Sequence, residues 1–156
     1  RPETIAAGDP HAALLEAFSR GDVTVLDTET TGLEIGLDEA VELAARRAGR
    51  EFYRIIRPSE ERLWVRLDEA SRIHGITRER VEAEGVPAEQ ALAEFQRFIE
   101  GSVVVGHNVT HYDWPLLQRQ SGGGLEAAGV ADTLDLARRL LKLNRYRLEN
   151  VVQHLG

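Results

Sequence analysis

Two short apolar segments, each running directly into polar residues, constrain the fold more than any other feature. Residues 23–26 (VTVL) lead into the acids of "DTETTGL", and residues 102–106 (SVVVG) lead into "HNVTHYD". Short, continuous apolar runs rich in β-branched residues indicate strands buried on both faces, which occur in sheets that helices cover. Helical patterns fill much of the chain between and after these strands. The alternation predicts one α/β domain built around a covered sheet.

The other elements follow from turn residues and periodicity. We predict a helix that begins at Pro10 and stops at Gly21, with Leu14, Leu15 and Phe18 on one face. Two strands are predicted over 41–48 and 51–57, around a turn at Gly49, followed by a short helix within 67–76. Pro87 is expected to open a further helix that points Leu92, Phe95 and Ile99 inward. Further helices are predicted over 110–120, 134–143 and 147–155, with a flexible loop at "SGGG" (121–124). Residues 1–22 are expected to form an N-terminal helical extension and residues 23–156 the main domain.

Composition narrows the class of protein. The chain has 156 residues, no cysteine and a net charge of −7. Without cysteine, a metal ion would have to be held by oxygen or histidine ligands. The net charge argues against an evenly basic nucleic-acid-binding surface, although local basic patches remain compatible with it. No apolar run could cross a bilayer and no signal-peptide pattern is present, so we expect a cytoplasmic protein without a membrane partner.

Asp27 and Glu29 are the first candidates for chemistry. Side chains two residues apart on an extended segment point the same way, so these carboxylates should converge just past the end of their strand, while Thr28 points elsewhere. Two carboxylates held together repel each other unless a cation joins them, and Mg²⁺ or Mn²⁺ prefers such oxygen ligands. A solvated turn with two exposed acids has the same spacing. The D-x-E pattern alone therefore leaves both interpretations open.

The second apolar strand adds His107, Asn108 and Asp113. Each has a structural explanation when taken singly. Thr110 and Asp113 have a spacing like that of a capping box, and an acid suits a helix N-terminus. His107 and Asn108 could satisfy backbone groups of the loop. Only the two polar strand ends taken together are specific enough to indicate a particular function.

Together, "DTETTGL" and "VVVGHNVTHYDWPLL" resemble the DEDD superfamily of 3′→5′ exonucleases, in particular the branch typified by the proofreading epsilon subunit of bacterial DNA polymerase III. The stretches "RIHGIT" (72–77), "VADTLDLARRLL" (130–141) and "YRLENVVQHLG" (146–156) also resemble that branch and occur in the expected order. The resemblance covers nearly all of the chain from Val23 onward. It implies a ribonuclease H-like mixed sheet flanked by helices.

The same resemblance implies a two-metal exonuclease that hydrolyses DNA 3′ ends in proofreading or repair. Asp27 would bind both Mg²⁺ or Mn²⁺ ions, Glu29 the ion that activates water, and Asp113 the second ion. The residues expected at the 3′-terminal nucleotide are Thr30, Thr31, Gly32 and Leu33, with His107 and Asn108 lining the same cleft.

Single-stranded DNA is the expected partner, and a polymerase or helicase could be attached or associated. RNA stays an alternative substrate, because only contacts to the 2′-hydroxyl separate the two.

The family's third motif, a histidine followed five positions later by an aspartate, does not occur in this sequence. His154 lies in a segment that resembles the helix before that motif, Tyr146 and Asn150 mimic a Y-x-x-x-D variant with the wrong last residue, and Asp132 is explained as a helix N-cap. We expect that the chain stops before its own third motif. Losing a general base costs about 10²–10⁴-fold in rate, so the chain as given should be poorly active. The alternative is a non-catalytic nucleic-acid-binding or scaffolding module of the same fold.

Two groups of basic residues are candidates for phosphate contacts. Arg138, Arg139, Lys142, Arg145 and Arg147 form a run without acids that suits a phosphate contact or a solvated helix face equally well. Arg46, Arg47, Arg50, Arg54 and Arg57 are expected to decorate one face of the sheet.

Overall fold

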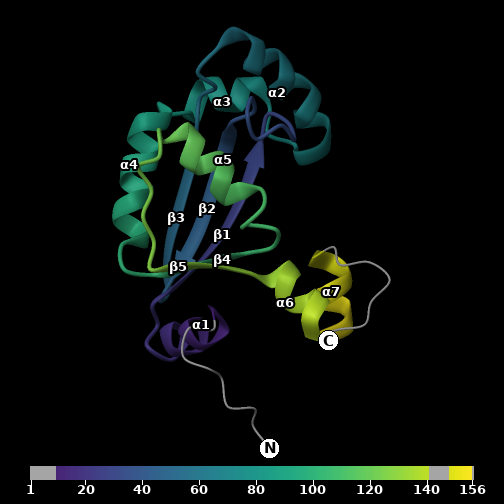
Figure 1. Ribbon diagram of the computed structural model, residues 1–156. Coiled ribbons are helices and arrows are strands. Elements are labelled where there is room, and N and C mark those ends of the chain that lie inside the picture. Colours follow the sequence, from purple (N-terminus) through teal and green to yellow (C-terminus); the bar gives the residue numbers. More distant parts are fainter. Residues whose placement is uncertain (1–9, 141–147, 156) are drawn as a thin grey trace, which may run out of the picture.

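A computed structural model describes residues 10–140 and 148–155. A five-stranded sheet forms the centre of the molecule, with helices against one face and at both ends (Figure 1). In chain order the elements are α1 (Pro10–Ser19), β1 (Val23–Thr30), β2 (Ala40–Arg47), β3 (Arg50–Ile55), α2 (Glu61–His74), α3 (Arg78–Glu84), α4 (Ala88–Ile99), β4 (Val103–Gly106), α5 (Asp113–Gln120), β5 (Gly129–Asp132), α6 (Thr133–Leu140) and α7 (Leu148–Leu155).

The sheet is mixed, as expected, with the strand order β3-β2-β1-β4-β5. β1 pairs antiparallel with β2, and β2 with β3, whereas β1, β4 and β5 run parallel. β1 therefore lies in the middle of the sheet, between a local hairpin and a strand that follows some 70 residues later in sequence. This position fixes the register of β1 with both neighbouring strands.

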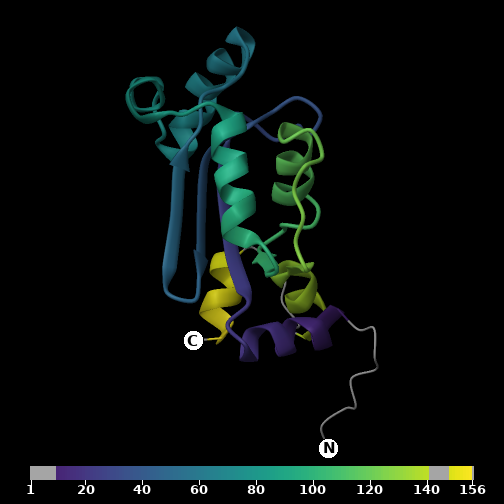
Figure 2. The ribbon, with the colours of Figure 1, turned by 90° about the vertical axis from the view of Figure 1, so that its left-hand side faces the viewer.

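The main core lies between the sheet and the helices α4 and α5, which cover one face (Figure 2). Leu26, Leu43 and Phe52 point from the strands into this core, where Phe52 meets Phe95 of α4 with ring centroids 5.6 Å apart. The predicted inward face of α4 is confirmed, because Leu92, Phe95 and Ile99 are all buried. The amphipathic pattern of α4 was therefore a reliable guide to its packing.

The other face of β1 is exposed around Val25 and Asp27, and we call it the open face; the prediction that residues 23–26 form a strand buried on both faces is wrong. β4 is buried along its whole length, as predicted, but Val25 on β1 is 54% exposed. β1 also continues to Thr30, so Asp27 and Glu29 lie within the strand and not beyond its end. The four residues VTVL gave no sign of this, since alternating burial of Val25 and Leu26 cannot be read from residues that are all apolar or β-branched.

Four elements differ from the predicted ones, and one of them is α5, which begins at Asp113 and not at residue 110. α2 begins earlier than expected, at Glu61, while α3 and the edge strand β5 were not predicted. β5 has only four residues (GVAD) and pairs with β4 alone, so it carries too short a pattern to distinguish it from the start of the following helix.

Helix α1 packs through Ala17 against Val103 and Val105 of β4. Leu15 and Phe18 are 58% and 73% exposed, so the face predicted to be apolar points largely away from the sheet. Whether residues 1–22 form a separate extension stays a prediction. Among the described residues, no helix has the length and apolar character needed to cross a membrane.

The expectation that five arginines decorate one face of the sheet is wrong. Arg46 pairs with Glu51 on the open face, whereas Arg54 pairs with Glu94 of α4. Arg47 donates to the carbonyls of Phe98 and Glu100 at the end of α4. Neighbouring side chains on a strand point to opposite faces, which explains the split. In the other basic group Arg138 is exposed, and the remaining side chains lie outside the described part.

Candidate active site

Asp27 and Glu29 project from the open face of β1, and Asp113 approaches them from the first turn of α5. Val25 is paired with Val105 in the parallel β1–β4 ladder, so the chain leaves β4 toward α5 beside Asp27. A Cβ on Gly106 would lie 2.9 Å from the Leu26 carbonyl oxygen, which shows how closely the two strands approach here. The predicted convergence of the acids from the two polar strand ends is thus present in the fold.

Asp113 is the most strongly perturbed of the three acids. It is 7% exposed, and burial, partly opposed by a hydrogen bond from the Thr28 hydroxyl and reinforced by the nearby Asp27, raises its pKa to about 6. A carboxyl group with this pKa changes its protonation state just below neutral pH. Such a perturbed acid in a group of acids is typical of functional sites.

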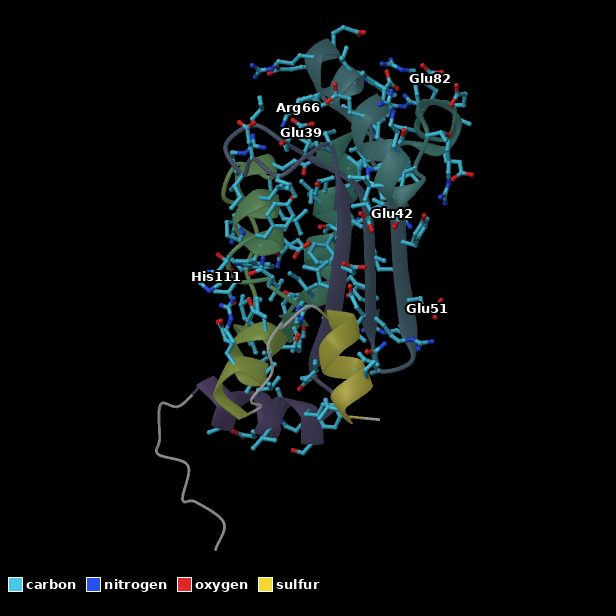
Figure 3. All side chains as sticks on the ribbon, turned by 90° about the vertical axis from the view of Figure 1, so that its right-hand side faces the viewer. Glu39, Glu42, Glu51, Arg66, Glu82 and His111 are labelled. Carbon is cyan, nitrogen blue, oxygen red and sulfur yellow. The ribbon has the colours of Figure 1, made fainter. Side chains whose placement is uncertain are left out.

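Burial also raises the pKa values of Asp27 and Glu29, and mutual repulsion among the acids adds to the effect. One of the repelling groups is Glu42, which lies directly opposite Glu29 in the β1–β2 ladder. Glu42 is oriented by the Tyr53 hydroxyl, which donates to it at 2.5 Å, and it is labelled on the open face in Figure 3. The site therefore gathers four carboxylates, of which Glu42 pairs with Arg80 at 3.9 Å.

This donor set fits a hard divalent cation, since carboxylate oxygens are the ligands that Mg²⁺ and Mn²⁺ prefer. In the described part of the chain, however, the one group whose ligand atoms all lie within 4.8 Å is His111, Asp132 and Asp135. Asp132 accepts from the backbone N–H groups of Asn108, Thr110 and Leu134, so its oxygens already have structural partners. The repelling acids around Asp27 have greater need of a cation, and we regard them as the better candidate.

A tight turn follows Glu29 and leads to Leu33. The Thr30 hydroxyl donates to the Gly32 carbonyl at 2.7 Å, and the Tyr112 hydroxyl donates to the same oxygen at 2.5 Å. Tyr112 directly precedes Asp113, so this contact ties the turn to the start of α5. The hydroxyl of Thr31 has an internal role, because it donates to Asp38 and accepts from the Glu39 N–H.

The side chain of Asp38 anchors this turn. Its side chain is fully buried, and Arg66 of α2 donates to both of its oxygens, at 2.7 and 2.6 Å. Burial alone would raise the pKa of Asp38, but the hydrogen bonds from Arg66, Glu34 and Thr31 lower it. A Cβ on Gly32 would lie 2.5 Å from an Asp38 oxygen, so glycine is required at this point of close approach.

Leu33 stands out from this rigid support with 84% of its surface exposed. An exposed leucine on a fixed turn can contact an apolar surface such as the face of a nucleotide base. The predicted contact of Leu33 with a terminal base is therefore sterically open, and it stays a prediction.

His107 and Asn108 follow β4, next to β1, as predicted. His107 shares a 3.0 Å hydrogen bond with the Thr133 hydroxyl, and Asn108 has a left-handed backbone (φ 60°). Asp132 caps α6 through Leu134, which agrees with its interpretation as an N-cap, and it also holds the loop after β4 through Asn108. The substrate contacts expected of His107 and Asn108 stay predictions, as do the expectations for Tyr146, Asn150 and His154, which lie outside the described residues and side chains.

The sequence reasoning missed three residues that shape the site: Glu42, His74 and Tyr112. His74 closes α2, and its Nε2 lies 3.0 Å from the Thr30 carbonyl oxygen while Nδ1 accepts from the Ile76 N–H. It belongs to the stretch "RIHGIT", but nothing in the sequence of that stretch predicts a contact with Thr30. Glu42 carried a weak signal, since it is an acid among the apolar residues of the first part of β2 (AVELAA).

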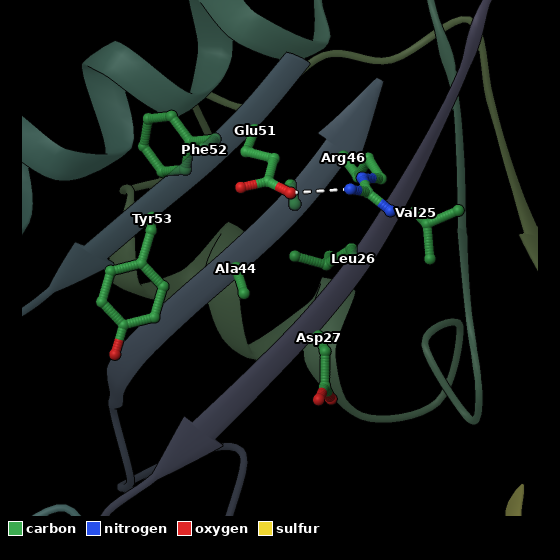
Figure 4. Close-up of a pocket in the computed structure, with 9 residues that line it drawn as sticks. Val25, Leu26, Asp27, Ala44, Arg46, Glu51, Phe52 and Tyr53 are labelled. Carbon is green, nitrogen blue, oxygen red and sulfur yellow. Dashed lines mark hydrogen bonds and ion pairs between the residues drawn. The ribbon is translucent and has the colours of Figure 1, made fainter. Parts of the chain in front are cut away.

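A shallow cavity of about 300 Å³ lies on the open face next to the acids (Figure 4). Val25, Ala44 and Tyr53 form its apolar floor, Asp27 lies at one end, and the Arg46–Glu51 ion pair lies across it. The cavity is thus continuous with the acidic site.

Comparison with known families identifies the fold and its relatives. Residues 24–156 match the family described as Exonuclease (RNase_T). The chain belongs to this exonuclease family. It is therefore a member of the DEDD-type 3′→5′ exonuclease superfamily, and the resemblance stated above is confirmed.

Relatives of this exonuclease-family chain include much longer proteins. The PolC-type DNA polymerase III of Thermotoga maritima is 39% identical over 147 residues, which are 87% of this chain and 10% of the relative. The DNA polymerase III subunit epsilon of Rickettsia conorii is 33% identical over 141 residues, which are 80% of this chain and 58% of the relative. The chain thus spans only a part of each.

Among solved structures, E. coli Exonuclease I in complex with a dT13 oligonucleotide has a similar fold. The TM-score is 0.71 at 17% identity, over 84% of this chain and 35% of that chain. This likeness confirms the predicted ribonuclease H-like sheet flanked by helices.

Proposed function

We propose that this chain is the catalytic module of a divalent-metal-dependent 3′→5′ exonuclease that acts on single-stranded DNA ends. The observation that carries the proposal is the gathering of Asp27, Glu29 and Asp113, all with raised pKa values, beside the exposed Leu33. The family membership supports the reaction class. The names of the polymerase relatives support proofreading as the setting, and we propose a polymerase as the partner.

In this proposal Asp27, Glu29 and Asp113 hold two Mg²⁺ or Mn²⁺ ions. Such ions lower the pKa of bound water and stabilise charge on the attacking and leaving oxygens of a phosphodiester. The turn at Gly32, fixed by Tyr112 and Asp38, holds Leu33 against the terminal base, so that the last phosphodiester lies over the acids. The acids face a polyanion, and they can bind it only when cations neutralise their charge.

Residues 1–156 contain no histidine followed five positions later by an aspartate, the pattern of the family's general base, so these residues tested by themselves carry no such pair. We therefore expect slow turnover, about 10²–10⁴-fold below that of an enzyme with such a base. A non-catalytic module of the same fold that binds nucleic acid is the competing proposal.

The test is degradation of a 5′-labelled single-stranded DNA oligonucleotide in Mn²⁺, with excess enzyme to detect slow turnover. We expect a ladder that shortens from the 3′ end and disappears in Asp27→Asn. Asp68→Asn, which removes an exposed acid of α2, is the matched control and should retain the ladder. Oligonucleotide binding without cleavage would support the non-catalytic module, and a ladder that survives Asp27→Asn would refute the assigned site. The same assay with an RNA oligonucleotide compares the two substrates.

A further inference from the structure

We propose that Thr28 is a positioning residue for the metal site, which it serves by orienting the Asp113 carboxylate through its hydroxyl group. This inference rests on the proposed function. It assigns a role to the residue between the two acids of "DTETTGL", which points away from them.

The geometry follows from the strand. Asp27 and Glu29 share the open face of β1, so Thr28 projects from the opposite face, toward α5. There its hydroxyl donates to Oδ1 of Asp113. Thr28 is 9% exposed and Asp113 is 7% exposed, so the contact is shielded from water.

The contact joins two elements that are 85 residues apart in sequence. β1 supplies both the ligands Asp27 and Glu29 and the hydroxyl that orients the third acid. The Thr28 hydroxyl occupies one oxygen of Asp113, which limits rotation of the carboxylate and directs its remaining acceptor capacity toward the cation. Outer partners of this kind orient metal ligands, and their loss weakens metal affinity by about 10–100-fold.

A purely structural role is the competing explanation, and the same strand offers a matched control for it. Thr24 also points into the covered face of β1, and its hydroxyl makes a buried 2.7 Å hydrogen bond with Ser102. Thr24→Val and Thr28→Val therefore each remove one buried hydroxyl from β1 with little change of shape. Only Thr28 contacts one of the candidate metal ligands.

The experiment is isothermal titration calorimetry of the full chain with MnCl₂, which measures Mn²⁺ affinity. It compares the wild type with Thr28→Val, Thr28→Ser and Thr24→Val. We expect Thr28→Val to bind Mn²⁺ about tenfold or more weakly, the range seen when an outer partner is lost. Thr28→Ser, which keeps the hydroxyl, should restore most of the affinity. Thr24→Val should bind as the wild type does, even though it also loses a buried hydrogen bond.

Equal affinity of Thr28→Val and the wild type would overturn this inference alone. So would an equal loss in Thr28→Val and Thr24→Val, because a general loss of stability would then explain both. Absence of Mn²⁺ binding by the wild type would overturn the proposed function as well. If Thr28→Val does not fold, Thr28→Ala and Thr28→Ser replace it, and the inference then requires weaker binding in the alanine variant only.

Discussion

At the scale of single residues, Asp113 shows a conflict between folding and function. Its pKa is raised to about 6, chiefly by burial, whereas the same group in an unfolded chain has a pKa of 3.8. Between these two values the folded chain binds the proton more tightly than the unfolded chain does. The free energy of unfolding therefore falls as pH rises from about 4 to 6, and at neutral pH the metal-free protein carries a destabilising charge.

Asp113→Asn should remove this penalty. In EDTA at pH 7.5, we expect the variant to be more stable than the wild type by on the order of 2 kcal/mol, since each pKa unit corresponds to about 1.4 kcal/mol. Near pH 4 the difference should shrink, because the folded wild type is then already protonated. Urea unfolding at the two pH values measures both quantities.

Asp68→Asn is the control, because it should change the stability in the opposite direction. A hydrogen bond from Arg78 lowers the pKa of Asp68, so its negative charge is favourable in the folded chain. This variant should be slightly less stable than the wild type at pH 7.5. A destabilised Asp113→Asn at pH 7.5 would contradict the account given for Asp113.

At the scale of elements, the loop between β1 and β2 is fixed by two arginines from different helices. Arg66 of α2 binds the Asp38 side chain, while Arg119 of α5 donates to the carbonyls of Ile35 and Asp38. Asp38 in turn accepts from the Glu34 N–H at 2.8 Å. The loop that presents Leu33 is thus rigid because both helices hold it.

Arg66→Met should loosen this loop without unfolding the sheet. We expect hydrogen exchange of the Glu34 amide to become about tenfold faster or more, since the loss of one fixed contact lowers the local opening free energy. Arg62→Met, on the same helix, is the matched control, because Arg62 is 64% exposed and pairs only with Glu60 among the described residues. Unchanged exchange at Glu34 in Arg66→Met would show that Arg119 alone fixes the loop.

Local patterns predicted the elements that are long or uniformly apolar, such as α4 and β4, and the convergence of Asp27 with Glu29. They failed where a contact depends on distant parts of the chain. The partners Asp38 and Arg66 are 28 residues apart, and Thr30 and Tyr112 are 82 apart. Neither pair has a signature in sequence, because such contacts arise only after the helices have packed. The exposed face of β1 was missed for a local reason, because the residues VTVL carry no polar alternation that could mark it.

At the scale of the whole molecule, a net charge of −7 and an acidic site would face the polyanionic substrate proposed above. We expect single-stranded DNA to bind at least about tenfold more tightly in Ca²⁺ than in EDTA, because the cation removes the repulsion. Fluorescence anisotropy with a labelled oligonucleotide at constant ionic strength measures this.

Asp27→Asn should reduce the Ca²⁺ effect, whereas Glu51→Gln, on the same face of the sheet, should leave it nearly intact. Equal binding in EDTA and Ca²⁺ would show that a basic surface, and not the acidic site, holds the DNA.

The central position of β1 also has a consequence for how the protein acquires its site. The β1–β2 hairpin is local, but Asp113 reaches Thr28 only after β4 has closed a loop of some 80 residues against β1. Closing a long loop costs entropy before any contact rewards it, so distant pairings form late in folding. The four acids therefore come together in one of the last steps of folding, and a nascent chain emerging from the ribosome cannot assemble the proposed metal site until β4 and α5 have been synthesised.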